Sequence, residues 1–157
     1  MRFRPTDEEL IRDYLRLRFW DLPITPAGII NDENVYNYPP DLLRKRWCGH
    51  DDRRMYFFTN LEMKDKSIIN ARHSVGEVGY WKATQAQAKI TKNHPTLGTK
   101  TPLSYYKFVL DKNGKKVGRK QNWLMQEYTL PDNRSLDGEL VLCVVYSHEK
   151  GKKKLPS

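Results

Sequence analysis

The stretch VGYWKATQAQAKI, residues 78–90, joins a short strand-like run to a polar, uncharged continuation. Tyr80, Trp81 and Thr84 are residue types that suit a pleated, half-buried surface. The continuation QAQA, residues 85–88, offers hydrogen-bond donors and acceptors and small apolar contacts without charge. The stretch therefore predicts a strand that begins in a core and ends in a segment facing something outside that core.

Four other runs have the same character. They are MYFFTN (55–60), LSYYKFVL (103–110), NWLMQEYTL (122–130) and ELVLCVVYS (139–147). Short runs rich in aromatic and β-branched residues predict antiparallel strands. Asn113-Gly114 is a hairpin signal, and Pro131-Asp132-Asn133 predicts a turn after the fourth of the five runs.

The N-terminal part of the chain predicts helices instead. Thr6 and Glu9 have the spacing of a capping box, and the apolar pattern continues to about Phe19, with Pro23 and Pro26 expected to stop the helix. Pro39-Pro40-Asp41 predicts a second, short helix that runs through Trp47. Helices followed by strands predict an α+β fold.

The length and the charge distribution indicate one domain with a polyanionic partner. A chain of 157 residues is long enough for a single core, here taken as 1–150, with 151–157 as a Lys-rich tail or linker start. The net charge is +9, and residues 61–120 carry 13 basic and 4 acidic side chains, against 10 and 10 in residues 1–60 and 5 and 5 in residues 121–157. Such segregation favours nucleic acid as the partner, before an acidic protein or an anionic membrane surface.

Enzymatic, metal-binding and membrane signatures are missing from the sequence. There is no GxxxxGK[ST], GxGxxG, HExxH or GxSxG motif, so no catalysis is expected. Cys48 and Cys143 are too few for a four-ligand zinc site, and no metal or cofactor is expected. No apolar run reaches the roughly 18 residues of a membrane span, and the N-terminus has no apolar segment typical of a secretory signal, so we expect a reducing compartment.

The aromatic residues admit two interpretations. Tyr80, Trp81, Tyr105, Tyr106 and Trp123 are either stacking platforms for single-stranded nucleic acid or the core of the sheet. We favour the core, because the chain has few other large residues. The lysines and polar residues of an edge strand then remain to enter a groove of duplex DNA. Single-strand or RNA binding is favoured only if Tyr80 or Trp81 is exposed.

Seven of these segments together resemble one family. FRPTDEEL (3–10), DLP (21–23), YFFT (56–59), GYWKAT (79–84), YYKF (105–108), NWLMQEYTL (122–130) and LVLCVVY (140–146) occur in the order of the NAC domain of plant transcription factors. The resemblance runs from Arg2 to about Tyr146. It implies a twisted antiparallel β-sheet flanked by N-terminal helices, without a metal. It also implies a nuclear, dimeric domain that inserts the WKAT-bearing strand edge into the major groove of DNA sites with a CGT-type core.

The resemblance also assigns residues. Lys82 matches the lysine of WKAT, Lys64 and Arg72 match basic residues ahead of it, and Lys120 matches best in a basic hairpin. The predicted DNA-binding residues are Lys64, Arg72, Lys82, Thr84, Gln85, Gln87, Lys89, Lys115, Lys116, Arg119 and Lys120. Arg2 and Glu9 match an arginine and a glutamate that pair across the family's dimer interface, in a homodimer or in a heterodimer with a related domain. Glu9 also has the local role of a capping-box residue, and Arg2 lies at a terminus that tends to fray.

The chain departs from the family pattern after WKAT. The family has a glycine followed shortly by an acidic residue, where this chain has Gln85 and Gln87. Loss of a negative charge and the ability of Gln to bind adenine edges favour an altered base preference. The bulk of Gln85, which takes a positive φ only at a cost, would instead make insertion shallower. We favour the altered base preference over the shallower insertion. The rival function is an interaction module that keeps the fold and the dimer but has weakened DNA binding, and so modulates related proteins.

Overall fold

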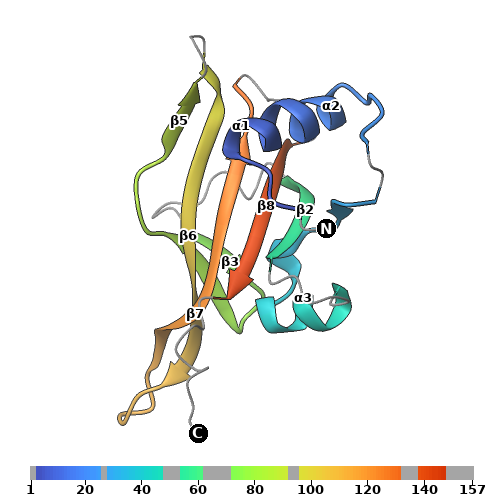
Figure 1. The fold of residues 1–157 in the computed structure, drawn as a ribbon. Coiled ribbons are helices and arrows are strands. Elements are labelled where there is room, and N and C mark those ends of the chain that lie inside the picture. The colour runs from blue at the N-terminus through green and yellow to red at the C-terminus, as the bar shows by residue number, and fades with distance from the viewer. Residues whose placement is uncertain are drawn as a thin grey trace, which may run out of the picture.

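The computed structural model describes residues 3–25, 28–47, 54–61, 72–91, 96–131 and 138–147, with residues 72 and 73 described by their backbone alone. One twisted sheet organises these residues (Figure 1). Its strands are β1 (Asn31–Asp32), β2 (Arg54–Leu61), β3 (Arg72–Val75), β4 (Gly79–Ala83), β5 (Ala88–Thr91), β6 (Thr96–Leu110), β7 (Lys116–Thr129) and β8 (Glu139–Ser147). The helical segments are α1 (Asp7–Glu9), the π-helical η1 (Leu10–Leu15), α2 (Arg16–Phe19), the 3-10 segment η2 (Val35–Asn37) and α3 (Pro40–Trp47).

The strand order is β1-β2-β8-β7-β6-β4-β3, and β5 pairs with β6 alongside β4. β1 is parallel to β2, and the other pairs are antiparallel. The α+β class and the five expected strands are confirmed, although β6 and β7 are longer than expected. β6 and β7 extend as a hairpin well beyond the body of the sheet, at the lower left of Figure 1.

The N-terminal helical run begins at the expected capping box. The Thr6 hydroxyl accepts a hydrogen bond from the Glu9 amide at 3.1 Å, and Glu9 Oε1 accepts one from the Thr6 amide at 2.9 Å. This reciprocal pair satisfies amides that have no partner inside the helix. The capping role expected for Glu9 is therefore confirmed.

The end of this helix corrects the expectation that prolines stop it. The helix ends at Phe19, well before Pro23, and Asp21 takes the left-handed conformation with φ 57°. The Leu22 amide donates to the Leu17 carbonyl at 2.8 Å, and the Asp21 amide donates to the Arg18 carbonyl at 3.0 Å. This is the Schellman pattern of helix termination. Local hydrogen bonding thus ends the helix before any proline is reached.

The helical run from Asp7 to Phe19 covers one face of the sheet, which we call the helix face (Figure 1). Its buried residues Leu10, Ile11 and Leu15 pack with sheet residues that include Tyr128, Leu142 and Val144. Asp7 fixes the start of the helix to the sheet: it accepts hydrogen bonds from Lys100 Nζ at 2.7 Å and from the Tyr128 hydroxyl at 2.6 Å. Burial raises the pKa of Asp7, but these two partners outweigh it and the net pKa is lowered.

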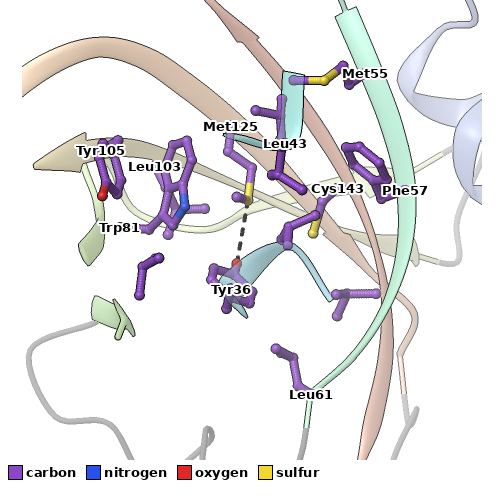
Figure 2. Close-up of a cluster of buried hydrophobic side chains, with 14 residues drawn as sticks. Tyr36, Leu43, Met55, Phe57, Leu61, Trp81, Leu103, Tyr105, Met125 and Cys143 are labelled. Carbon is purple, nitrogen blue, oxygen red and sulfur yellow. Dashed lines mark hydrogen bonds between the residues drawn. The ribbon is translucent and has the colours of Figure 1, made fainter. Parts of the chain in front are cut away.

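The opposite side, which we call the α3 face, holds the second core cluster. Trp81, Leu103, Tyr105 and Met125 pack there with Leu43 of α3 (Figure 2), and further members are Val35, Tyr36, Met55, Phe57, Leu61, Val75, Val141, Cys143 and Val145. The core role expected for Trp81 is confirmed, since its exposed fraction is 0%. The sheet is therefore covered by helical segments on both faces.

One buried polar contact crosses the α3-face cluster. The Tyr36 hydroxyl donates to Glu127 Oε2 at 2.6 Å and lies 3.4 Å from the Met125 sulfur, the contact dashed in Figure 2. Burial raises the pKa of Glu127, and the Tyr36 hydrogen bond offsets part of that rise. The carboxyl group therefore stays neutral to a higher pH than an exposed glutamate.

Candidate nucleic-acid interface

The stretch that follows WKAT forms a bulge in the edge of the sheet. The Thr84 amide donates to the Pro102 carbonyl at 3.0 Å, and Ala88 is the register partner of Lys100. Three residues, Gln85, Ala86 and Gln87, thus lie opposite the single residue 101 of β6. We call residues 85–87 the edge bulge. Bulges bend a strand and redirect its side chains, and they are frequent next to functional sites.

The edge bulge is open to solvent. Gln85, Ala86 and Gln87 are all exposed, as are Thr84 and Lys89 on either side of it. β3 covers only the part of β4 from Gly79 to Lys82, and among the described residues no strand pairs with the outer side of residues 84–91. An uncovered sheet edge of this kind presents backbone groups and side chains together to a partner.

Basic side chains flank the edge bulge on both faces of the sheet. Lys82 is the register partner of Ser104, so it lies on the same side as Tyr80 and Tyr106. Lys89 is the partner of Thr99, which belongs to the opposite side of β6. Both lysines are exposed. The edge therefore carries neutral polar groups at its rim and one described basic side chain on each face.

The basic residues of the β6–β7 hairpin are divided between the same two sides. Lys116 and Lys120 are the register partners of Leu110 and Tyr106, on the side of Lys82. Arg119 is the partner of Lys107, on the side of Lys89. Lys115 lies between the turn at 112–114 and the start of β7. The described members of the predicted basic set therefore lie on both sides of the sheet.

Aromatic packing holds the hairpin against β4. The rings of Tyr80 and Tyr106 are stacked with centroids 5.2 Å apart, Tyr80 also contacts Phe108 at 5.2 Å, and Lys116 Nζ lies 4.6 Å from the Phe108 ring centre. A β-carbon added to Gly118 would collide with the Tyr80 ring, so the glycine leaves room for it. Tyr80 and Trp81 are buried. Single-strand or RNA binding, which would be favoured by an exposed Tyr80 or Trp81, is therefore not supported.

Some predicted residues lie outside what the structure describes. Lys64 and Arg2 fall in undescribed segments, and of Arg72 only the backbone is described, directly opposite Lys82 in the β3–β4 register. Glu9 is described in its capping role, which leaves the proposed contact with Arg2 of a second protomer a prediction. Lys107 is not among the predicted DNA-binding residues, and the strand register places it opposite Arg119.

No group of His, Cys, Asp and Glu suitable for a metal ion occurs among the residues that the structure describes. In the same part of the chain, no helix has the length and apolar character needed to cross a membrane. Cys143, the cysteine that is described, is fully buried, and burial raises its thiol pKa well above the ordinary value. A buried, protonated thiol is a poor nucleophile.

The described part of the chain thus forms a sheet with a polar, uncovered edge, a kind of surface that is available to a partner. Comparison with known proteins then identifies its family. The family model described as "No apical meristem (NAM) protein" matches residues 1–130. The chain belongs to this family of NAC-domain proteins.

Curated relatives agree with this assignment. NAC domain-containing protein 41 of Arabidopsis thaliana is 38% identical over 152 residues, which is 92% of this chain and 52% of that protein. NAC transcription factor 29 of Arabidopsis thaliana is 34% identical over 164 residues, 98% of this chain and 58% of that protein. NAC domain-containing protein 1 of Solanum lycopersicum is 35% identical over 155 residues, 92% of this chain and 52% of that protein. The chain thus spans a little over half the length of these relatives.

Proposed function

We propose that this domain binds double-stranded DNA sequence-specifically as the DNA-binding part of a plant transcription factor in the nucleus, without catalysis. The observation that carries the proposal is the exposed edge bulge between Lys82 and Lys89. The name of one relative, NAC transcription factor 29, supports the same role. A homodimer or a heterodimer with a related domain, joined through Arg2 and Glu9, is part of the proposal.

The geometry of the edge suits the major groove. The groove is about 12 Å wide and is bounded by two phosphate backbones, and a strand entering edge-on turns its two faces toward these two walls. Lys82 on one face and Lys89 on the other are placed to neutralise phosphates of opposite walls. The rim between them carries Gln85 and Gln87, whose amides can bond the edges of bases, whereas phosphate contacts carry no sequence information directly.

Replacement of Lys82 by alanine tests this arrangement. We expect weaker binding to duplex DNA and a salt dependence, log K against log salt, that becomes shallower by about 0.9, the value for one lost phosphate contact. Because Lys82 is exposed, the free energy of unfolding should change by less than about 0.5 kcal/mol. Fluorescence anisotropy across a salt series and urea denaturation measure the two quantities.

Lys45→Ala is the matched control, because Lys45 is also exposed but lies on α3. It removes the same charge and should leave the salt slope nearly unchanged. Equal effects of the two substitutions on DNA binding would reduce the role of Lys82 to a contribution to net charge. A large loss of stability in Lys82→Ala would make the side chain structural.

The rival function is the interaction module with weakened DNA binding. Gln85 and Gln87 in place of the family's glycine and acidic residue are the observation that favours it. That module would form a stable dimer with a related domain, and it would bind DNA without sequence preference.

A further inference from the structure

Two basic side chains face each other across the projecting hairpin. Lys107 and Arg119 are direct register partners in the β6–β7 ladder, and both are exposed. Side chains at such positions have β-carbons about 4.5–5.5 Å apart, and like charges there destabilise the pair. Among the described residues, neither side chain makes an ion pair or a side-chain hydrogen bond. The hairpin therefore keeps an unfavourable cation pair with no described internal partner for it.

Both members of this cation pair are open to solvent. The next residue across the sheet is Gly79, the register partner of Lys107 on β4, and the ring of Tyr105 lies beside it. The nearest acidic residue along β6, Asp111, has its Oδ1 engaged by the amides of Asn113 and Lys115, each at 2.8 Å. An anion placed between Lys107 and Arg119 would turn repulsion into two favourable contacts.

The position of the pair along β6 indicates which anion it meets. Six residues of β6 separate residue 101, opposite the edge bulge, from Lys107, and at about 3.3 Å per residue they span roughly 20 Å. One turn of duplex DNA, about 10 base pairs, is about 34 Å long. A rod of duplex whose groove holds the edge bulge and that runs along the hairpin would thus present backbone phosphates at the pair about half a turn, or six base pairs, from the core.

We propose that Lys107 and Arg119 together hold a backbone phosphate of the DNA that flanks the recognition core. The proposal rests on the proposed function, because it requires a duplex already seated at the edge bulge. It adds a contact that carries no sequence information and extends the length of DNA that the domain uses. The face that carries it is opposite to the one that carries Lys82, so the two contacts are separate.

Duplexes of two lengths test the proposal. One carries the CGT-type core with three base pairs on each side, and the other carries the same core with ten base pairs on each side. The wild-type domain should bind the long duplex more tightly than the short one. Lys107→Gln and Arg119→Gln should each weaken binding to the long duplex by roughly fivefold, the upper range of an exposed ion pair. On the short duplex both should equal the wild type.

Controls make the outcome specific. Lys45→Gln removes one charge on α3 and should not change the ratio of the two affinities. Lys107→Arg keeps the positive charge, so this variant should retain the wild-type preference for the long duplex. Equal losses on both duplexes, or no loss on either, would overturn the proposal. Failure of the proposed function would look different, because the wild type would then show no preference for the core over a scrambled sequence even on the short duplex.

Discussion

Replacement of Trp81 by alanine is expected to lower the free energy of unfolding by about 3–5 kcal/mol, the range for removing a large buried aromatic side chain. Trp81 has no exposed surface, and its ring lies 5.2 Å from that of Tyr105 within the α3-face cluster (Figure 2). The cavity would lie directly beneath the strand that carries Lys82. Urea denaturation followed by circular dichroism measures the loss.

Trp81→Phe is the informative control. The Trp81 Nε1–H is buried and has no hydrogen-bond partner among the residues that the structure describes, and an unsatisfied buried donor costs roughly 1–3 kcal/mol. Phenylalanine loses volume but removes this cost, so its variant should be clearly more stable than the alanine variant. If Trp81→Ala destabilised the domain by less than about 1 kcal/mol, the tryptophan would not be a core residue. The stacking interpretation would then return.

Replacement of Gly79 by alanine is expected to cost about 3 kcal/mol, the upper part of the range for overpacking. An added β-carbon would overlap the carbonyl oxygen of Tyr106 and lie 2.5 Å from the Tyr105 hydroxyl. The carbonyl belongs to the backbone of the neighbouring strand, so relief requires β4 and β6 to separate. Because β4 leads into the edge bulge, the substitution should also weaken DNA binding.

Gly118→Ala is the matched control for Gly79→Ala. Its added β-carbon would meet the Tyr80 ring rather than backbone, and a ring end moves more easily than a strand. Gly118→Ala should therefore cost less than Gly79→Ala, as measured by thermal or urea denaturation. Similar stabilities of Gly79→Ala and the wild type would show that β4 is not held as closely to β6 as the structure has it.

The strands that build the core were predictable because their sequences carry a strong local signal. Runs such as ELVLCVVYS leave little alternative to a buried strand, and β8 has the predicted limits. The weak strands β1, β3 and β5 were missed. β5, with the sequence AKIT, buries one side chain, that of Ile90, so it is defined by pairing with β6 rather than by its own pattern.

The register of the hairpin explains why the arrangement of charges was not predictable. A two-residue Asn113-Gly114 loop would place Lys107 opposite Lys120. The structure instead pairs the Asp111 amide with the Lys115 carbonyl at 2.9 Å, and Gly114 takes φ 78°, which gives a three-residue loop. A shift of one residue moves every following side chain of β7 to the other face. The pairing of Lys107 with Arg119 depends on this shift.

The sequence indicated that the edge bulge is exposed, but it did not indicate the geometry of the bulge. The polar, uncharged character of QAQA indicated a surface that faces a partner, and Gln85, Ala86 and Gln87 are indeed exposed. The number of extra residues depends on where β5 resumes its pairing with β6, which is a long-range property. The family resemblance supplied the groove-binding hypothesis, and the structure supplied the two faces on which Lys82 and Lys89 lie.

The proposed function requires that the edge bulge distinguishes one DNA sequence from another. Fluorescence anisotropy with two labelled duplexes, one with a CGT-type core and one with the core scrambled, each titrated across a salt series, is the decisive measurement. We expect at least tenfold tighter binding to the core, about 1.4 kcal/mol, at every salt concentration where both affinities are measurable. Equal affinities that disappear together as salt rises would contradict it and leave the interaction module as the better explanation.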